Sequence, residues 1–549
     1  MRVVLASINC SYIHTALGIR WLYVSRDQKH ETFVRDFTIK DSIDKISDEL
    51  LSLNPDVIGL SVYIYNADIM KKLVSEISHR NSDIRILIGG PEVSYQYSDW
   101  LLLPLEAVLR GEGEVSFWQA VNLENPNNID GYASKNYISK IPYAMADLSY
   151  LETLESPFFL EMDKKSSKNK YLYLETSRGC PFTCSYCLSS LEKKIRLFSL
   201  DYVFKQLSQL EFNPCKQIKF LDRTFNVDST RALLIAKYID NLKVDNSFEF
   251  EVMVEYLDED LLSFFDNAKP GRYRFEVGVQ SFNQETLKSV NRYQNPEKLE
   301  QNIKRLVNHG NIVHTDLIAG LPYEDYNSFK NSFNRLYSLK STEMQIGILK
   351  LLRGTKLKDE SNKYEIRVTK EAPYTTFQTK WLGKEDLINI THLYHATEKL
   401  YNTGRLRYVL DYLFDDNQDV FEILVHVGKL IDNHHNNIQL KDYFLYLFDV
   451  IKNLTNYEEE KIKYLLMTDY YRLFKVKPTN IFHLHVDNNI VLEIYNKSGI
   501  NKNILYNYSV VQYGLFKGKV IYQLIIYSKE NKKPDIIWFN QDLSFFSKK

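Results

Sequence analysis

Three of the five cysteines in this 549-residue chain lie within eight residues of one another, at Cys180, Cys184 and Cys187. Iron–sulfur clusters normally take one cysteine thiolate per iron. Three thiolates at Cx3CxxC spacing can therefore bind three irons of a cubane cluster and leave the fourth iron open to another ligand. The spacing therefore predicts a 4Fe-4S cluster whose open iron can bind a reacting ligand.

Two other uses of these cysteines compete with the cluster. Structural zinc also accepts short cysteine spacings, but it takes four ligands and usually pairs two distant CxxC units, and the sequence has no second unit. A disulfide would leave one of the three clustered cysteines unpaired, and nothing in the sequence suggests export. The other two cysteines, Cys10 and Cys215, stand alone.

A predicted strand positions this loop. Residues 171–176 (YLYLET) alternate in a strand-like way, and the turn residues Arg178, Gly179 and Pro181 follow them. We therefore expect the thiolates to lie just beyond the carboxyl end of a strand.

The cysteine spacing, with the aromatic residue Tyr186 before the last cysteine, resembles the signature of the radical S-adenosylmethionine (radical SAM) superfamily. The resemblance implies that the amino and carboxylate groups of S-adenosylmethionine (AdoMet) chelate the fourth iron. It also implies an electron donor such as flavodoxin or ferredoxin, and cleavage of AdoMet to methionine and a 5′-deoxyadenosyl radical that removes hydrogen from a substrate. The motif leaves open whether that substrate is a small molecule or a peptide.

The length and composition set limits on the protein's class. A chain of 549 residues predicts two to four domains, and 44% hydrophobic and 25% charged residues are ordinary for a soluble protein. Because 69 Lys and Arg balance 70 Asp and Glu, the net charge gives no strong nucleic-acid signal. We expect no membrane segment and a cytoplasmic location, since the sequence shows neither a signal peptide nor an apolar run of about 18 residues.

Residues 1–130 alternate between strand-like and helix-like patterns. Five apolar runs read as buried strands, at residues 2–9, 32–37, 56–65, 84–88 and 107–109. With helices between them, they predict an α/β fold with a Rossmann-like, doubly wound parallel sheet. Ligands bind such sheets at the carboxyl ends of the strands, where Ser61, Gly89 and Gly90 are expected.

Four segments of this region resemble, in order, the cobalamin-binding domain that precedes the barrel in one large radical SAM class. They are ALGIRWL (16–22), PDVIGLS (55–61), LIGGPE (87–92) and LRGEGE (109–114). The resemblance implies that Ser61, Gly89 and Gly90 bind cobalamin, and glycine allows a bulky ligand to approach the backbone. A Rossmann-like module that has lost its ligand or binds another is the alternative.

One part of the cobalamin pattern is missing. Domains that ligate cobalt through a protein imidazole carry Asp-x-His-x-x-Gly after the first strand, whereas here His14 follows Ser-Tyr-Ile and the next glycine is Gly18. His14 is in the right loop with the wrong spacing. We therefore expect a loop or helix-capping histidine rather than a cobalt ligand.

Residues 131–170 are predicted to be a linker whose polar run DKKSSKNK (163–170) forms a solvated turn. From residue 171 to 384, six strand signals alternate with helical patterns, at residues 171–176, 218–221, 248–254, 274–279, 313–318 and 345–351. These repeats predict a partial (β/α)6 barrel, in which chemistry occurs at the carboxyl ends of the strands. Polar or turn residues expected at that rim are Asp222, Arg223, Glu255, Gln280, Ser281 and Gly320.

The radical SAM resemblance implies roles for several of these residues. Asp222 in FLDRTFN would accept a hydrogen bond from the methionine amino group of AdoMet, with a helix N-cap as its alternative. Glu251 or Glu255, together with Gln280, would approach the ribose and carboxylate, although Glu251 could satisfy another polar group inside the barrel. Gly320 in DLIAGLP would lie against adenine, or serve only as turn chemistry.

Residues 385–549 read as helical to near Phe474 and then as strands at 490–495, 519–527 and 535–539, which predicts an α+β accessory domain. The layout resembles a cobalamin-dependent radical SAM family with an uncharacterised C-terminal domain. The two cofactors together imply methyl transfer to an unreactive carbon, with a radical rearrangement or cyclisation as the first alternative. A non-catalytic cobalamin or redox sensor is a third. A methylthiotransferase is disfavoured because the N-terminal region has no cysteine set for a second cluster.

Overall fold

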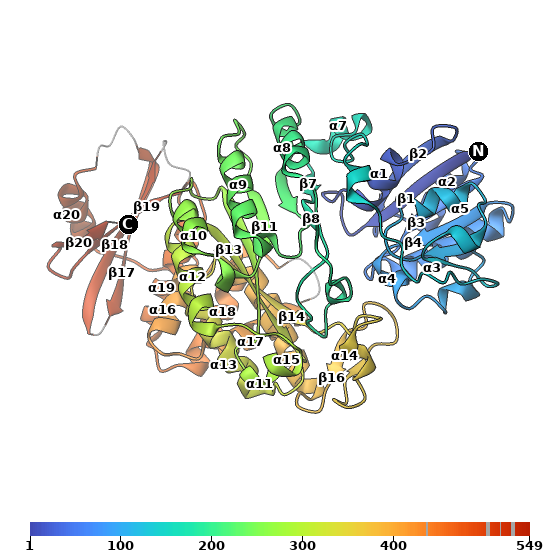
Figure 1. Cartoon of the computed structure of the whole chain (residues 1–549). Helices are drawn as coiled ribbons and strands as arrows, with labels where there is room; N and C mark the ends of the chain where they lie inside the picture. Colours follow the sequence, from blue (N-terminus) through green and yellow to red (C-terminus); the bar gives the residue numbers. More distant parts are fainter. Residues whose placement is uncertain (435–437, 501–504, 517, 529–532, 549) are drawn as a thin grey trace. The chain divides into compact units, whose positions relative to one another are not determined.

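The computed structural model of the chain describes residues 1–434, 438–500, 505–516, 518–528 and 533–548 (Figure 1). The chain divides into two units. Unit 1 contains Met1–Asp325, Leu339–Ser341 and Ile348–Gly383, and unit 2 contains Tyr326–Ser338, Thr342–Gly347 and Lys384–Lys549. The predicted domain boundaries near residues 130, 170 and 384 stay predictions. Among the helices that the structure describes, none is long and apolar enough to cross a membrane.

The N-terminal sheet of unit 1 has the order β2-β1-β3-β4-β5-β6. Its strands are β1 (Arg2–Asn9), β2 (Glu31–Thr38), β3 (Val57–Ser61), β4 (Arg85–Gly89), β5 (Ala107–Leu109) and β6 (Tyr132–Ala133). The first five are parallel, as predicted. Its helices are α1 (Leu17–Val24), α2 (Ile43–Leu51), α3 (Ala67–Arg80), α4 (Pro91–Ser94) and α5 (Ser116–Val121). Ser42 caps α2 by accepting a hydrogen bond from the Lys45 N–H.

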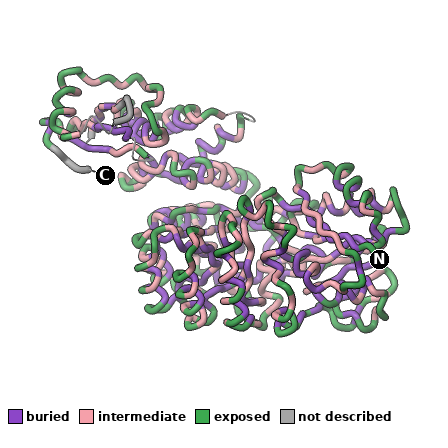
Figure 2. The backbone as a smooth tube through the Cα atoms, turned by 90° about the horizontal axis from the view of Figure 1, so that it is seen from above, coloured by how far each residue is buried: buried purple, intermediate pink, exposed green. Residues whose placement is uncertain are grey.

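Apolar side chains cover both faces of this sheet. On one face, Val4 and Ile58 of the strands share a buried cluster with residues of α2 and α3. On the other face, Leu5 and Leu87 pack with residues of α1 and α5. The sheet is therefore doubly wound. Figure 2 colours the backbone by burial, and β1, which follows the N-terminus, is buried after Arg2.

The predicted linker is more ordered than its composition indicates. It contributes β6, which pairs antiparallel with β5, and the short helices α6 (Leu148–Leu151) and α7 (Lys164–Ser167). The prediction of a solvated turn at residues 163–170 is wrong at its first residue, because Asp163 forms an ion pair of 2.6 Å with the buried Arg20. That partner is distant in sequence, so local polarity does not reveal it.

All six predicted barrel strands are present. They are β7 (Tyr171–Leu174), β10 (Gln217–Phe220), β11 (Phe248–Val252), β12 (Tyr273–Gln280), β13 (Ile312–Ala319) and β14 (Glu343–Ile348). Within unit 1 the order is β13-β12-β11-β10-β7, and every pairing in that set is parallel. Helices α8 (Leu200–Ser208), α9 (Ser229–Asp240), α10 (Glu259–Asp266), α11 (Gln284–Ser289) and α12 (Pro296–Asn308) alternate with the strands, and α13 (Tyr326–Tyr337) belongs to unit 2.

A small hairpin encloses the cysteine loop. Strands β8 (Ser177–Arg178) and β9 (Arg196–Leu197) pair antiparallel on either side of it. Two-residue strands carry no periodicity, so the sequence analysis did not predict them. The last segment of unit 1 adds α14 (Lys356–Asp359) and the strands β15 (Arg367–Val368) and β16 (Thr376–Gln378).

Unit 2 is α+β, as predicted. Its helices are α15 (Lys384–Ala396), α16 (Arg407–Asp415), α17 (Val420–Asn433), α18 (Leu440–Leu454), α19 (Glu459–Arg472) and α20 (Asn488–Ser498). An antiparallel sheet follows, with β17 (Leu505–Phe516), β18 (Lys519–Ser528), β19 (Asp535–Phe539) and β20 (Phe545–Lys548) in order. The predicted strand at 490–495 is wrong, because these residues lie in α20, which Asp487 caps. Such a short apolar run fits a helix as well as a strand.

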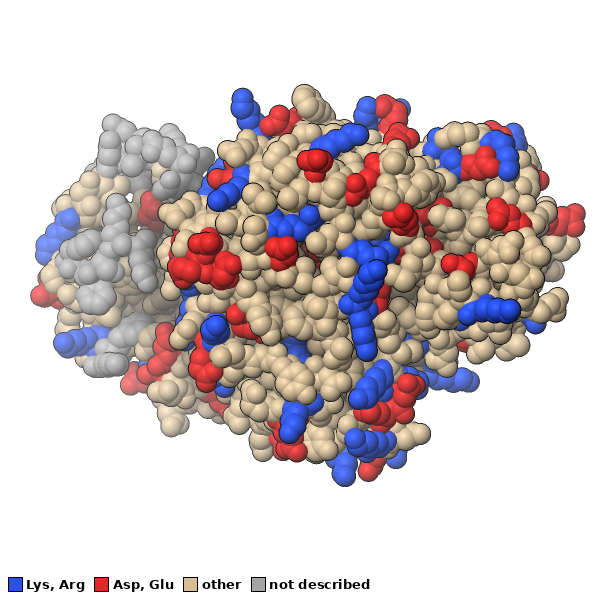
Figure 3. Space-filling view, viewed as in Figure 1, with Lys and Arg blue, Asp and Glu red and all other residues tan. Residues whose placement is uncertain are grey.

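Acidic and basic side chains are interspersed on the face shown in Figure 3. This agrees with the balanced total of 69 basic and 70 acidic residues.

Candidate active site

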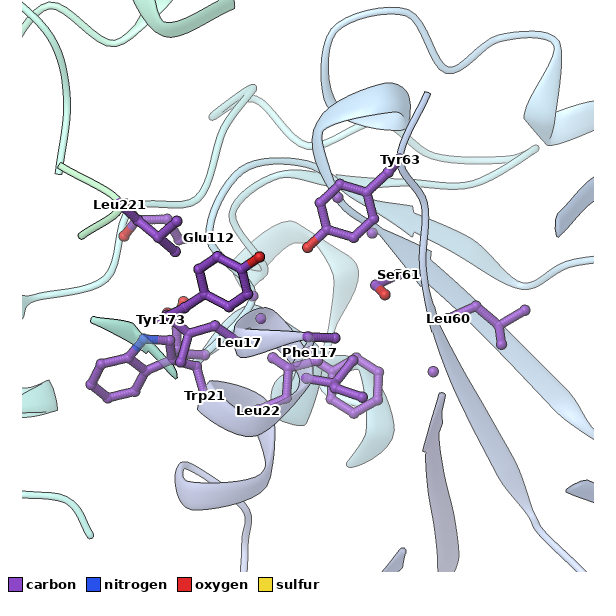
Figure 4. Close-up of a pocket in the computed structure, with 18 of the residues that line it drawn as sticks. Leu17, Trp21, Leu22, Leu60, Ser61, Tyr63, Glu112, Phe117, Tyr173 and Leu221 are labelled. Carbon is purple, nitrogen blue, oxygen red and sulfur yellow. The ribbon is translucent and has the colours of Figure 1, made fainter. Parts of the chain in front are cut away.

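A cavity of about 540 Å³ lies at the carboxyl ends of the strands of the N-terminal sheet (Figure 4). Ser61, Gly89 and Gly90, predicted from the sequence to meet a ligand, all line it. The barrel side of unit 1 contributes further lining residues, Tyr173, Glu175, Arg178, Leu221 and Arg223. The phenol rings of Tyr63 and Tyr173 point into the cavity from opposite sides (Figure 4). The N-terminal sheet, predicted to bind cobalamin, and the barrel, predicted to bind AdoMet, thus line the same cavity.

The glycine pair after β4 allows close backbone approach at this cavity. Gly90 has φ +110°, and a Cβ there would lie 2.5 Å from the Val62 carbonyl oxygen. A Cβ on Gly89 would lie 3.3 Å from the Leu109 carbonyl oxygen. Position 90 therefore requires glycine, and this edge of the cavity is formed by bare backbone.

The cavity also contains an unsatisfied polar atom. Ser61 Oγ is buried and has no hydrogen-bond partner in the described part of the chain. A buried hydroxyl without a partner is unfavourable unless a ligand or water supplies one. A large ring with amide groups at its rim, such as a corrin, fits both the bare backbone and this hydroxyl.

His14 lies in the loop between β1 and α1 and lines the same cavity. Its Nδ1 forms a hydrogen bond with the Tyr173 hydroxyl, and the two rings stack with centroids 6.2 Å apart. Burial lowers the pKa of His14, with a smaller contribution from Lys219. His14 therefore lies in a loop, and the helix-capping variant is wrong because Ala16 occupies the N-cap of α1. That His14 is not a cobalt ligand stays a prediction.

The cysteine loop is largely buried. Cys180 and Cys184 are buried and Cys187 is partly exposed. The loop is held by backbone hydrogen bonds from Cys180 N–H to the Glu192 carbonyl (2.9 Å) and from Ser185 N–H to the Val290 carbonyl (2.9 Å). Within the described ranges, no group of three or more His, Cys, Asp or Glu residues is arranged to hold a metal ion. The assignment of the three cysteines to a cluster stays a prediction.

Asp222 anchors the base of this loop. Its carboxylate is fully buried and accepts hydrogen bonds from the Thr176 N–H (3.0 Å), the Thr176 hydroxyl (2.6 Å) and the Ser177 hydroxyl (2.6 Å). Burial raises its pKa, against the effect of these hydrogen bonds. The N-cap alternative is wrong, since Asp228 caps α9. Contact with the AdoMet amino group stays a prediction for a carboxylate that already has three donors.

The other predicted AdoMet residues lie at the carboxyl ends of their strands or directly after them. Glu251 on β11 is in register with Glu276 on β12, and its carboxylate lies 3.8 Å from Arg223. Gln280 ends β12 at a bulge with φ +67°, and its Oε1 is buried with no hydrogen-bond partner in the described structure. Gly320 follows β13 with φ +101°.

Glu255 presents a second unsatisfied atom at this rim. It is buried in the turn after β11, and its Oε1 also has no hydrogen-bond partner among the described residues. Two buried amide or carboxylate oxygens without partners fit a ligand that brings hydrogen-bond donors, as the ammonium and ribose groups of AdoMet do.

A buried ion-pair network, which no sequence motif indicated, joins the two regions. Arg178 pairs with Glu112 (3.0 Å) and Glu114 (2.7 Å) of the loop after β5, and with Glu175 (2.8 Å). Arg196 also pairs with Glu112. The segment LRGEGE (109–114) contains both carboxylates of that loop, Glu112 and Glu114, but the sequence does not show which residues they contact.

Arg292 was also missed, and no motif indicated it. It is 9% exposed, and its Nη1 lies 3.8 Å from Cys184 Sγ.

Family models match three parts of the chain. The radical SAM superfamily matches residues 174–336, the B12 binding domain matches residues 2–121, and a protein of unknown function (DUF4080) matches residues 362–536. The first two correspond to the barrel and to the glycine-lined sheet described above.

Individual proteins agree with these matches. The uncharacterized methyltransferase PH0819 of Pyrococcus horikoshii is 24% identical over 72% of this chain and 87% of its own length. The anaerobic magnesium-protoporphyrin IX monomethyl ester cyclase of Rubrivivax gelatinosus is 25% identical over 55% of this chain, which spans only 57% of that relative. In structure, the cobalamin-dependent S-adenosylmethionine radical enzyme OxsB matches with a TM-score of 0.59 at 17% identity, over 91% of this chain and 81% of OxsB.

The likeness to OxsB shows a shared fold, and the family models assign the two functional domains. The chain therefore contains a B12 binding domain, a radical SAM domain and a C-terminal DUF4080 region, and the cofactors of the first two domains are cobalamin, a [4Fe–4S] cluster and AdoMet.

Proposed function

We propose that this protein catalyses methyl transfer to an unreactive carbon of its substrate. The observation that carries the proposal is the cavity of about 540 Å³, whose lining combines Ser61, Gly89 and Gly90 with Glu175 and Arg178 next to the cysteine loop. When bound, cobalamin supplies the methyl group, and the cluster with AdoMet supplies the radical that removes hydrogen. A shared cavity would let one substrate reach both.

The chain's own residues would hold these groups. Cys180, Cys184 and Cys187 would ligate the cluster, and Ser61, Gly89 and Gly90 would contact cobalamin. Glu251, Gln280 and Gly320 would contact AdoMet at the rim, where the unpartnered oxygen of Gln280 supports the assignment. Asp222 would act mainly by fixing the strand end that precedes the cysteines, because its carboxylate accepts three hydrogen bonds from Thr176 and Ser177.

Two partners follow from the proposal. A low-potential electron donor such as flavodoxin or ferredoxin would supply the electron that reduces the cluster. The substrate would be a small molecule or a peptide able to enter the cavity.

Anaerobic incubation of the reconstituted protein with AdoMet, labelled in its methyl group, and an extract of cells tests the proposal. Methyl transfer predicts 5′-deoxyadenosine together with label in a new product. The wild-type protein should contain about four irons per chain. Two irons, or bound zinc, would contradict the central assignment.

A second candidate is a radical cyclisation or rearrangement, because one relative is named as a cyclase. It predicts 5′-deoxyadenosine with no methyl label in the product. A sensor would bind cobalamin and produce neither. The Cys184→Ala variant is the control in each arm, since it should abolish AdoMet cleavage in an enzyme and change nothing in a sensor.

A further inference from the structure

Residues 188–197 (LSSLEKKIRL) follow the last cysteine of the loop and lead back into the hairpin that encloses it. The backbone of this segment lies directly against the cysteine loop. The Cys180 N–H donates a hydrogen bond to the Glu192 carbonyl oxygen at 2.9 Å, and a Cβ on Gly179 would clash with the Lys194 carbonyl oxygen. Residues 192–194 are therefore adjacent to the first of the three cysteines.

The same segment reaches solvent. Cys180 and Cys184 are buried, whereas Cys187, from which the segment starts, is partly exposed. Leu191 is 38% exposed and Leu197 is 41% exposed. Electron transfer between two proteins falls off steeply with the distance between their cofactors. A donor protein could therefore bring its own cofactor close to the cysteine loop by binding to residues 188–197.

The exposed part of the segment is basic. Three basic residues, Lys193, Lys194 and Arg196, stand against one acidic residue, Glu192, which leaves a net charge of plus two. Arg196 is paired with Glu192 and with Glu112. Lys193 and Lys194 are exposed and take part in no ion pair among the residues that the structure describes. Since no carboxylate neutralises these two ammonium groups, they can attract a negatively charged partner.

We propose that Leu191, Lys193, Lys194 and Leu197 form a lysine patch on which an acidic protein docks to donate one electron to the cluster. The inference rests on the proposed function and adds to it the surface that the donor binds. Transient electron-transfer complexes have small interfaces, and interfaces combine an apolar centre with a polar rim. Two exposed leucines next to two unpaired lysines supply both parts.

One electron moves in this step, and no bond forms or breaks. The hydroquinone anion of a flavodoxin, an acidic donor of this class, loses one electron and becomes the neutral semiquinone. The cluster core gains that electron and changes from 2+ to 1+. The lysines exchange neither an electron nor a proton. They attract and orient the donor, which raises the association rate, and salt weakens this effect by screening the charges.

Stopped-flow reduction of the reconstituted protein by flavodoxin hydroquinone, without AdoMet, tests the inference. In Lys193→Glu/Lys194→Glu, the second-order rate constant at low salt should fall about tenfold or more. Reduction by the radical of 5-deazaflavin, a small neutral reductant, should keep its wild-type rate. Lys205→Glu/Lys237→Glu is the matched control, because it makes the same change of charge at exposed positions of α8 and α9.

Three results would overturn the inference. The first is a wild-type rate with flavodoxin in Lys193→Glu/Lys194→Glu. The second is an equal slowing in the control variant, which would show a general effect of net charge. The third is an equal slowing with both reductants, which would assign the two lysines to the cluster itself rather than to the donor.

If the charge reversal prevents cluster assembly, Lys193→Gln/Lys194→Gln decides the question. It should slow reduction by flavodoxin by a smaller factor, and an unchanged rate overturns the inference. The wild-type protein provides an independent measurement. Its rate with flavodoxin should fall as the salt concentration rises from about 0.05 M to about 0.5 M, and a rate that does not depend on salt overturns the inference as well.

The proposed function fails in a different way. Normal reduction by flavodoxin, without methyl label in a product, would contradict methyl transfer and leave the lysine patch as the docking surface. Label transfer driven by 5-deazaflavin, with reduction by flavodoxin unaffected by the lysine substitutions, would support methyl transfer and overturn the docking surface.

Discussion

The two parallel sheets of unit 1 use their faces differently. Strand β1 of the N-terminal sheet is buried at every position after Arg2, because helices cover both faces. Strand β12 of the barrel alternates, with Tyr273 and Phe275 packed against Phe265 of α10 and with Arg274 and Glu276 on the opposite face. A sheet covered twice can bind ligands only at its edge, whereas the barrel sheet keeps one face for polar groups.

That difference explains the chemistry of each site. At the edge of the N-terminal sheet, Gly89 and Gly90 leave bare backbone at the cavity, so under the proposed function a ligand would be bound there mainly by the shape of the cavity. On the polar face of the barrel sheet, Glu249 pairs with Arg274 at 3.0 Å and with Lys219, and Glu276 lies 3.9 Å from Lys219. The edge of the N-terminal sheet is therefore distinguished by its shape, and the polar face of the barrel sheet by its charged side chains.

The strongest way to separate the two sites is Cys184→Ala. Loss of one of three cluster ligands should abolish the cluster and AdoMet cleavage, while cobalamin binding in the N-terminal sheet should persist. Iron content and the absorption of bound cobalamin measure the two outcomes on one sample. Cys215→Ala, which alters a partly exposed cysteine outside the loop, is the control. Cluster content near the wild-type value in Cys184→Ala would contradict the assignment.

The second test concerns the ion pairs that join the sheets. Arg178→Met leaves Glu112, Glu114 and Glu175 without their shared cation in a buried site, which should cost about 3–5 kcal/mol of stability. Arg80→Met is a matched control, because Arg80 also has three carboxylate partners but lies at the surface. It should cost much less stability than Arg178→Met, because ion pairs at the surface contribute little. Urea unfolding of both variants checks this, and equal losses would show that the network at Arg178 is not specially buried.

Much of this comparison was predictable from sequence. The five N-terminal parallel strands, all six barrel strands and the placement of Ser61, Gly89 and Gly90 on one cavity follow from local patterns that a window of residues contains. The Arg178 network was not predictable, because Arg178 and Glu114 are 64 residues apart and nothing local relates them. The contact between Arg292 and Cys184 was also not predictable, because the two residues are 108 positions apart in the sequence. The features that were not predicted are therefore contacts of charged side chains with residues distant in the sequence.

The glycine-lined edge gives a smaller expected effect. Gly90→Ala forces an L-residue to φ +110° and places its Cβ 2.5 Å from the Val62 carbonyl oxygen. The strain is about 1–3 kcal/mol and should weaken cobalamin retention roughly tenfold or more while iron content stays unchanged. Gly404→Ala is the control for backbone strain without a steric clash. Gly404 also has a positive φ, +67°, but a Cβ there would meet no atom within 4 Å. Wild-type cobalamin affinity in Gly90→Ala would remove this edge from the binding site.

The smallest expected effect tests the charged face of the barrel through pH. Burial and the neighbouring carboxylate of Glu249 raise the pKa of Glu276 to about 8. The folded protein therefore holds a proton there that the unfolded chain, at the ordinary value of 4.5, releases earlier. The associated stability is present at low pH and is lost as pH rises through about 8.

Glu276→Gln removes this titration, so the variant should gain thermal stability relative to wild type as pH rises from about 5.5 to about 8.5. Glu285→Gln, at an exposed position of α11, controls for the loss of one negative charge. Melting temperatures of the three proteins at both pH values measure the effect. A difference between Glu276→Gln and wild type that does not change with pH would mean that the barrel face holds Glu276 charged. Lys219 would then be the cation that stabilises the charged Glu276. The barrel face would still differ from the edge of the N-terminal sheet through the ion pairs of Glu249 with Lys219 and Arg274.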